Sequence, residues 1–262
     1  MLYNQHIMSF KKILATFTLV WASFGAFAME DIPDAPSDRL VGDIGAAVYS
    51  SQLNIGTQGT QSFVMPYGFA DYQRLFVRID TVGVKTLKMG YGNLELVGKV
   101  MFDNYNVTSP YNGSTLNKLN PLPIGIGTFQ ETPIGGFFIN AYHDFGQSRG
   151  ALYEIQYFAE LKPTHWFTLY PVAGIERQSA QFANYYYGIS AANALQTGYT
   201  PYNAAGSNNL MAGMLVEIPL VDNWILNVYG KRKWMGAGIN NSPVMIRSFQ
   251  DNGFVAVAYR FK

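Results

Sequence analysis

Few side chains in this 262-residue sequence could act as acids, bases or nucleophiles. The sequence contains three histidines and no cysteine. His143 is followed directly by Asp144, and such a pair could move protons in catalysis only with a nucleophile within hydrogen-bond reach. The sequence has no G-x-S-x-G motif, and no second acidic pair is spaced to lie opposite His143. We therefore interpret the pair as an exposed histidine beside a solvated aspartate, and we predict no catalytic residues and no enzyme.

The sequence also lacks the residues that are usual in metal, cofactor and nucleic-acid sites. Cysteine ligands are missing, and His165 precedes Trp166 at a predicted turn, where both side chains suit a lipid headgroup region. The 18 basic and 17 acidic residues leave a formal charge of +1, so the chain lacks the basic character of nucleic-acid-binding proteins. We predict no metal site, no cofactor and no nucleic-acid partner.

The first 28 residues read as an export signal. Lys11 and Lys12 precede an apolar stretch over 13–24, and Ala26-Phe27-Ala28 has the small-residue pattern of a signal cleavage site. No later apolar run approaches the length of a membrane-spanning helix. The pattern predicts a cleaved signal peptide over 1–28, a short periplasmic segment over 29–39 and a single β-barrel domain over 40–262.

The remaining sequence alternates between apolar and polar residues. In 94–103 the apolar side chains recur at every second position and the charged ones lie between them, and the same holds for 153–161, 224–231 and 254–261. A period of two is the signature of β-strands with one apolar and one polar face. The fold class predicted is all-β, built of antiparallel strands.

Spacing of these segments indicates a membrane barrel. We count about twelve strands, with ten as the fallback if 83–90 and 121–131, which glycine and proline interrupt, are loops. Short connections such as 162–164 alternate with long polar ones over 51–60, 104–120, 178–207 and 235–250. Short periplasmic turns and long extracellular loops are typical of outer-membrane barrels. The strands are expected near residues 40–50, 61–70, 73–80, 83–90, 93–104, 121–131, 134–144, 149–161, 164–177, 207–219, 223–234 and 251–261.

The competing fold is a soluble β-sandwich or a lipocalin-like barrel, which would turn its apolar face inward. More than half of the few charged residues share the opposite face, and burying single unpaired ions there costs several kcal/mol each. A lipid-facing apolar surface avoids that cost, so we expect a membrane barrel with a charged lumen. Because acids and bases are nearly balanced, we expect them to pair and to leave a narrow or closed passage. The predicted lumen charges include Arg74, Arg78, Asp80, Glu95, Lys99, Glu154, Glu160 and Lys231.

Two loop motifs are more specific. Tyr185-Tyr186-Tyr187-Gly188-Ile189-Ser190 is followed by Gly198 and by Pro201-Tyr202, and Asn240-Asn241-Ser242-Pro243-Val244 follows the penultimate predicted strand. These segments resemble the "Y-Y-G-V-S … G-x-x-x-Y" and "A-D-S-P-I/V" motifs of the MipA/OmpV family (MltA-interacting protein), with Asn241 where an Asp is usual. The resemblance extends over nearly the whole mature chain and implies an outer-membrane β-barrel protein of a Gram-negative bacterium.

The resemblance also implies candidate roles. The family is described as barrels that scaffold enzymes that synthesise and cleave peptidoglycan, so a murein hydrolase or synthase is the expected protein partner, beside the lipid of the outer membrane. Other members are treated as adhesins or as porin-like channels. A structural scaffold is therefore the leading hypothesis, with a surface adhesin or a narrow channel as the alternative.

Both motifs fall in predicted loops. Within 178–207, a short helix is expected, with Ser190 as its N-cap and Gly198 following its last turn. We expect this loop to fold over the lumen as a cap, packed by Tyr185, Tyr186, Tyr187 and Tyr202. The loop 235–250 is expected to fold inward beside it, with Asn241 nucleating a turn through its amide oxygen and Pro243 fixing the backbone.

Overall fold

The alternating segments form the strands of a closed antiparallel barrel. The computed structural model describes residues 38–56, 59–102 and 105–262, so the predicted cleavage residues Ala26 and Ala28 lie outside the described residues. Going along the chain, the strands of the barrel are β1 (Val41–Gln52), β2 (Thr60–Tyr72), β3 (Leu75–Arg78), β4 (Thr81–Met89), β5 (Gly92–Lys99), β8 (Pro123–Thr132), β9 (Gly135–Asp144), β10 (Ala151–Phe158), β11 (Leu161–Thr164), β12 (Phe167–Gln178), β13 (Ser207–Pro219), β14 (Trp224–Trp234) and β15 (Phe249–Phe261).

Closure follows from the pairing. Each strand pairs with its neighbour in the chain, β5 pairs with β8, and β15 pairs with β1 from Gly42↔Phe261 to Gln52↔Asp251. β10 and β11 both pair with β12, so they are one interrupted strand and the barrel has twelve. The interruption lies opposite Pro171, which has no N–H to donate, and the carbonyl of Pro171 accepts from the N–H of Ala159.

The prediction of twelve strands is confirmed, and the ten-strand fallback is wrong. The two segments expected to be weakest, 83–90 and 121–131, form β4 and β8. Gly83 lies within β4 without breaking it. A Cβ at this position would lie 2.2 Å from the carbonyl oxygen of Leu96. Glycine at this position permits the close approach of β4 to β5.

Two predicted boundaries are wrong. The segment 73–80 was expected to be one strand, but β3 holds only Leu75–Arg78, and Ile79 and Asp80 form a turn partway up the wall. The predicted turn at Lys162-Pro163-Thr164 is part of β11, and the chain turns at His165 and Trp166 instead.

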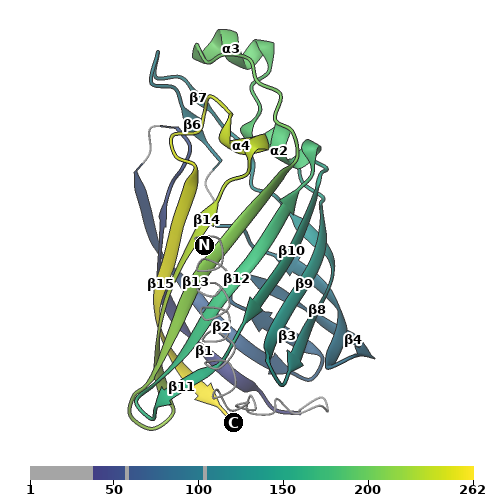
Figure 1. Ribbon diagram of the computed structural model, residues 1–262, viewed down its shortest axis with the longest axis vertical. Coiled ribbons are helices and arrows are strands. Elements are labelled where there is room, and N and C mark those ends of the chain that lie inside the picture. The colour runs from purple at the N-terminus through teal and green to yellow at the C-terminus, as the bar shows by residue number, and fades with distance from the viewer. Residues whose placement is uncertain (1–37, 57–58, 103–104) are drawn as a thin grey trace, which may run out of the picture.

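The two ends of the barrel differ (Figure 1). Short turns and the C-terminus lie at one end. The long connections lie at the other end, which carries α2 (Ala180–Tyr187), α3 (Ala191–Thr197), α4 (Ala237–Asn240) and the small hairpin of β6 (Val107–Thr108) and β7 (Thr115–Leu116). By the rule for such barrels, the end with short turns is periplasmic. None of the helices in the described ranges is long and apolar enough to span a membrane.

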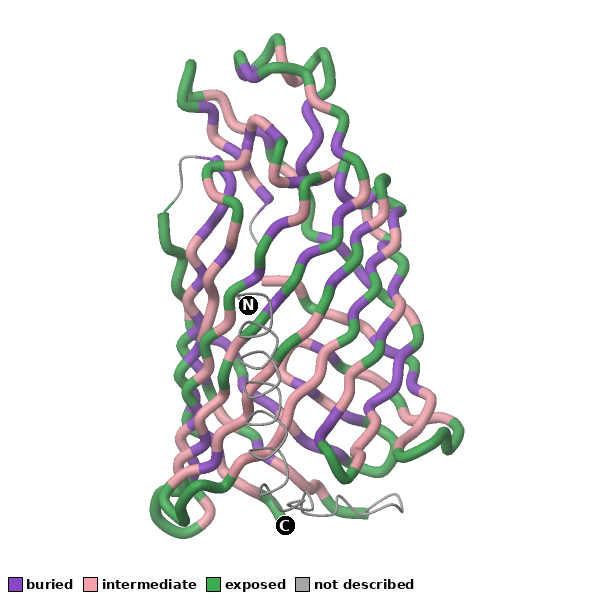
Figure 2. Tube along the Cα trace, in the orientation of Figure 1, coloured by how far each residue is buried: buried purple, intermediate pink, exposed green. Residues whose placement is uncertain are grey.

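Burial alternates along each strand (Figure 2). Side chains that point outward are apolar and exposed, as in Val64 (74% exposed), Leu96 (55%) and Val255 (50%). Side chains that point inward include many buried polar and charged groups, such as Glu95, Glu154 and Glu176. An apolar outer band around a polar interior is the arrangement of a barrel solvated by lipid.

Candidate functional site: the lumen and its cap

Near the periplasmic end, a bidentate arginine inside the barrel binds two carboxylates. Arg260, near the end of β15, places Nε 2.8 Å from Asp43 Oδ1 on β1 and Nη2 2.7 Å from Glu217 Oε2 on β13. Both carboxylates are buried. A planar guanidinium with five donors suits two carboxylates at once, so this triad links three strands.

A second cluster lies beside β3. Arg78 is buried, with Nη2 2.7 Å from Asp71 Oδ1, and Lys85 Nζ lies 3.2 Å from Asp71 Oδ2. The Arg78 guanidinium also lies over the rings of Phe69 and Phe129, at 4.8 and 5.7 Å from their centroids. Stacking and pairing together hold this cation inside the barrel.

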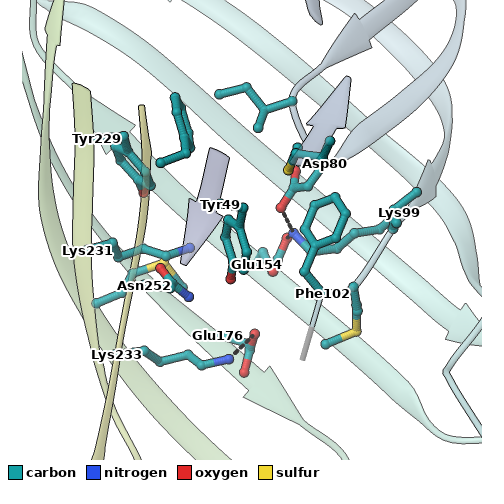
Figure 3. A pocket seen from close by; sticks show the side chains of 16 residues that line it. Tyr49, Asp80, Lys99, Phe102, Glu154, Glu176, Tyr229, Lys231, Lys233 and Asn252 are labelled. Carbon is teal, nitrogen blue, oxygen red and sulfur yellow. Dashed lines mark hydrogen bonds and ion pairs between the residues drawn. The ribbon is translucent and has the colours of Figure 1, made fainter. Parts of the chain in front are cut away.

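The outer half of the lumen holds a third group of ion pairs (Figure 3). Lys99 Nζ on β5 lies 2.8 Å from Asp80 Oδ2 and 3.0 Å from Glu154 Oε2 across the lumen on β10. Lys233 Nζ on β14 lies 3.6 Å from Glu176 Oε2 on β12. Glu176 also accepts from the side-chain amides of Gln178 and Asn209.

These pairs surround a cavity of about 80 Å³. Three acids (Asp80, Glu154, Glu176) and three lysines (Lys99, Lys231, Lys233) line it, so its charges balance. Tyr49, Phe102, Tyr229 and Phe254 complete much of the remaining lining. The size suits a few water molecules and falls well short of the roughly 300 Å³ of a typical small-molecule pocket.

Most predicted lumen charges do face the interior, and one does not. Arg78, Glu95, Lys99 and Glu154 lie inside the barrel, Asp80 and Lys231 line the cavity, and Glu160 pairs with Lys162 at 3.1 Å. Arg74 is exposed in the turn between β2 and β3 and is not a lumen residue. The prediction failed because β3 begins at Leu75, two residues later than the predicted strand 73–80, so Arg74 belongs to the turn.

Sequence reasoning also missed several polar residues inside the barrel. Asp71 and Lys85 complete the cluster at Arg78, and the fully buried amides of Asn209 and Asn227 lie inside the barrel. Asn227 Nδ2 donates to the hydroxyl of Tyr67 across 3.0 Å. These residues could have been found by applying the same period of two to uncharged amides and tyrosines as well as to charged residues.

The outer end is closed by an apolar cap. Four separate loops contribute fully or nearly fully buried side chains to one cluster: Ile55, Tyr105, Val107, Leu116, Phe182, Ala183, Tyr186, Tyr187, Ile189, Tyr199, Ala204, Met235, Ile239 and Val244. Tyr105 and Tyr186 have ring centroids 4.2 Å apart, and Tyr185 and Tyr202 pack at the edge of the cluster. The cap therefore has a core of its own above the ion-paired lumen.

Residues of the first motif hold this cap in shape. α2 is N-capped by Ser179 and ends at Gly188, where a Cβ would lie 2.2 Å from Asn184 Oδ1. The expected short helix is confirmed as α3, with Ser190 accepting from the N–H of Asn193 and Gly198 in the left-handed conformation at φ 76°. Pro201 is exposed, and the hydroxyl of Tyr202 donates to the carbonyl of Gly238 at 3.2 Å.

Asp144 is a buried junction between the barrel and the cap. Its Oδ1 accepts from the N–H groups of Leu122 and Gly146, each at 2.8 Å, and its Oδ2 accepts from the hydroxyls of Ser148 and Tyr186. Burial, and then the neighbouring Asp144 carboxylate, raise the pKa of Tyr186 well above its usual value. The interpretation of Asp144 as solvated is thus wrong. His143 is exposed and points to the opposite face, so the two side chains cannot act together.

The second motif connects its loop to the loop of the first motif through a hydrogen bond. The Ser242 hydroxyl donates to the carbonyl of Tyr187, and Ile55 forms an isolated β-bridge with Met245. Asn241 is exposed at the end of α4, with its N–H directed to Ala237, so the buried side-chain contact comes from Ser242 and not from Asn241.

Beyond the cap, α3 and the β6–β7 hairpin form a joint projection. The hydroxyl of Ser109 donates to the carbonyl of Thr197, and the Asn112 amide donates to the carbonyl of Gln196 at 2.8 Å. Leu195 (90% exposed) and Tyr111 (70%) lie on its surface. Within 38–56, 59–102 and 105–262, no group of three or more histidine, aspartate or glutamate side chains is placed to hold a metal ion.

Comparison with known proteins agrees with this geometry. A family model described as MltA-interacting protein MipA matches residues 44–261. The chain is similar to outer membrane protein OmpV of Vibrio cholerae serotype O1, with 24% identity over 81% of this chain and 79% of that protein. It is also similar to outer membrane protein Omp26La of Vibrio anguillarum, with 26% identity over 53% of this chain, a match that spans only 54% of Omp26La.

Proposed function

The chain belongs to the MipA family of outer-membrane proteins, and on that premise we propose that it is a structural anchor in the outer membrane of a Gram-negative bacterium. Its partners would be murein-remodelling enzymes, a hydrolase or a synthase, held at the periplasmic end. The family description, which refers to interaction with MltA, supports the partner class.

The observation that carries the proposal is the closure of the barrel. Ion pairs join lumen-facing side chains of different strands near both ends of the lumen, the cavity among the outer ion pairs measures about 80 Å³, and an apolar cluster covers the outer end among the described residues. A barrel filled by its own side chains offers no conduit, as in small filled barrels. Partners outside the membrane can then bind only at the two ends of the barrel.

The periplasmic end presents the surface for such partners. Arg74 is exposed between β2 and β3, and the side chain of Lys162, beside the turn between β11 and β12, is 42% exposed. Trp166, in that turn, is 70% exposed. Arginine and tryptophan are enriched in protein interfaces, and the polar rim of an interface accepts charged side chains such as lysine.

Crosslinking in intact cells tests this directly. Full-length protein should capture a murein hydrolase or synthase, and the double variant Arg74→Glu/Lys162→Glu should reduce that capture about tenfold, as expected for disrupted charge complementarity. Leu195→Asp, a change at an exposed position of the opposite end, should leave capture unchanged. Recovery of no such enzyme, or equal recovery with the double variant, would refute the anchor.

A second candidate is adhesion through the outer projection. Leu195 and Tyr111 are large, exposed apolar side chains on a segment braced by Ser109 and Asn112. Exposed aromatic and aliphatic side chains on a rigid support suit recognition of another surface. In this case Leu195→Asp should lower binding of cells to a host surface, and Arg74→Glu/Lys162→Glu should not.

A further inference from the structure

On the outward face of β12, charge appears only at the outer end of the strand. The outward positions from Leu169 to Ile175 are uncharged, and the next outward position is Arg177. Arg177 alternates with Glu176 and Gln178, which are buried inside the barrel, so its exposed side chain points outward. This cation therefore lies at the outer border of the lipid-facing band.

The guanidinium of Arg177 is held at the surface by neutral neighbours. Its Nη1 donates to Asn208 Oδ1 across 3.1 Å. Gly206 leaves room for the group, because a Cβ at that position would lie 2.9 Å from Arg177 Nη2. Among the described residues, no carboxylate pairs with Arg177. The position of the guanidinium is thus fixed, while its charge and its remaining donors are left for a ligand.

A second arginine without an acidic partner lies in the loop between β9 and β10. Arg149 is exposed and has φ 51°, a left-handed conformation that residues other than glycine rarely adopt. Its two neighbours in the chain are buried: the N–H of Gly150 donates to the hydroxyl of Ser148 at 3.1 Å, and that hydroxyl donates to Asp144. Asp144 is thereby turned inward, and no acid in the described part of the chain pairs with Arg149. The loop holds a positive charge at the surface on a braced backbone.

The register brings the two arginines to one patch of the wall. Arg177 pairs with Tyr153 of β10, and Arg149 precedes Tyr153 by four residues, which corresponds to about 13 Å along a strand. His143 of β9 pairs with Ala151, which lies between these two positions, and the side chains of His143 and Tyr153 are both exposed. Figure 1 shows β9, β10 and β12 side by side. Two phosphates on one large headgroup would match two arginines at this separation, with hydrogen-bonding groups between them.

Aliphatic side chains continue the patch toward the middle of the membrane. One outward position further from the outer end, four large aliphatic residues are aligned across neighbouring strands and are all exposed: Ile139, Ile155, Ile175 and Leu210. Cations at the outer end, followed by an aliphatic row, reproduce the order of an amphiphile that has an anionic head and acyl chains.

Other parts of the outer rim differ from this patch. Arg232 of β14 is neutralised by Asp251, since its Nε and Nη2 each lie 2.7 Å from one carboxylate oxygen, and its guanidinium lies 4.1 Å from the ring centroid of Phe249. On β1 and β2 the outer ends carry neutral groups, and the hydroxyl of Ser62 donates to that of Ser50. Two arginines without a carboxylate therefore distinguish the wall of β9, β10 and β12 from these parts of the rim.

We propose that the patch formed by Arg149, Arg177, His143 and Tyr153 binds the headgroup of a diphosphorylated glycolipid in the outer leaflet of the membrane. Each arginine binds one phosphate through its planar set of donors. His143 and Tyr153 hydrogen-bond sugar hydroxyl groups between the phosphates, and the acyl chains lie along the aliphatic row. The site lies at the outer end and does not depend on the anchor function at the periplasmic end.

Lipid titration tests the site. The full-length barrel in detergent micelles is titrated with diphosphoryl lipid A, and the bound lipid is measured by native mass spectrometry. Monophosphoryl lipid A, which lacks one phosphate, should bind about fivefold more weakly, as expected for the loss of one cation–phosphate contact at a membrane surface. Phosphatidylglycerol, an anionic phospholipid without the sugar headgroup of lipid A, should bind more weakly than either. Equal binding of phosphatidylglycerol and diphosphoryl lipid A would overturn the proposal, as would no binding of lipid A.

Variants locate the contact. Arg177→Gln and Arg149→Asn should each weaken binding of diphosphoryl lipid A about fivefold, and the double variant about thirtyfold. Asparagine is chosen at 149 because it tolerates the left-handed conformation. Arg232→Gln is the matched control and should leave binding unchanged, because Asp251 already engages that arginine. All three positions are exposed, and heat-modifiable gel migration checks that the variants fold. A loss with Arg232→Gln as large as that with Arg177→Gln would overturn the assignment to this patch.

Discussion

The lumen and the cap close the same barrel by opposite means. The lumen is filled with charged groups that pair across strands, as Lys99 does with Asp80 and Glu154. The cap is filled with apolar and aromatic groups, of which Phe182 and Ile239 have no exposed surface. The strands force polar groups inward because lipid takes the apolar face, whereas the loops lie outside the lipid and can bury apolar groups as a soluble protein does.

This difference implies different responses to substitution. Loss of one member of a buried ion pair leaves a charge without a partner, and that affects the whole barrel. Loss of a buried ring in the cap leaves a cavity in a small local cluster, which can open while the strands remain paired.

The largest effect is expected for Lys99→Met. It leaves the buried carboxylate of Glu154 without its cation, removes one cation from the partly exposed carboxylate of Asp80, and should lower the free energy of unfolding by about 3–5 kcal/mol. Arg232→Met removes the solvent-exposed pair with Asp251 on the outer surface and should have a much smaller effect. Urea midpoints of folding in phospholipid vesicles measure both. Adding Glu154→Gln to Lys99→Met should recover part of the loss, and no recovery would mean that the pair is not coupled.

Next is Phe182→Ala in the cap. Removal of a fully buried ring should destabilise the cap by about 3 kcal/mol while the urea midpoint of the barrel stays within error. Limited proteolysis should show new cleavage within 178–207, with heat-modifiable gel migration retained. A shift in the barrel midpoint as large as that of Lys99→Met would show that cap and barrel unfold as one unit.

A smaller effect is expected for Tyr186→Phe. This change keeps the ring contact with Tyr105 and removes one donor to Asp144, which retains the N–H groups of Leu122 and Gly146. The free energy of local unfolding of α2 should fall by about 1 kcal/mol, which would be seen as faster hydrogen exchange in α2. Asp144→Ala removes the acceptor for all of these donors and should cost more. Equal exchange rates in the two variants would contradict the role of Asp144 as a junction.

The smallest effects are expected in the second motif. Pro243→Gly should loosen the loop by about 1 kcal/mol or less through the entropy of the unfolded chain, and the exposed Asn241→Asp should leave folding unchanged. Ser242→Ala, which removes the bond to the Tyr187 carbonyl, should exceed both. The rate of proteolysis within 235–250 ranks the three variants. A larger effect for Asn241→Asp than for Ser242→Ala would show that Asn241, and not Ser242, makes the contact that holds the loop.

The barrel could be predicted from the sequence because its signal is local. Alternation in 94–103 or 254–261 needs no knowledge of the partner strand. The end of β3 could not be predicted, because Ile79 and Asp80 continue the pattern and Ile79 turns the chain in a conformation its residue type disfavours.

The cap was predicted only in part, for a related reason. Tyrosines at 185–187 and the capped helix α3 are local features, and the structure has them. That Ile55, Val107 and Val244 join the same cluster depends on where four loops converge. The burial of Asp144 likewise depends on Leu122 and Tyr186, which are distant in the sequence.

Planar-bilayer recording of the pure, full-length protein is the most direct test of whether the lumen of the barrel is occluded. If the ion pairs fill the lumen and the cap covers it, wild type should show no large, steady conductance steps, and removal of the cap contacts by Phe182→Ala should produce at most small, brief events. Large, steady steps from wild type would contradict the closed barrel and favour a porin-like channel.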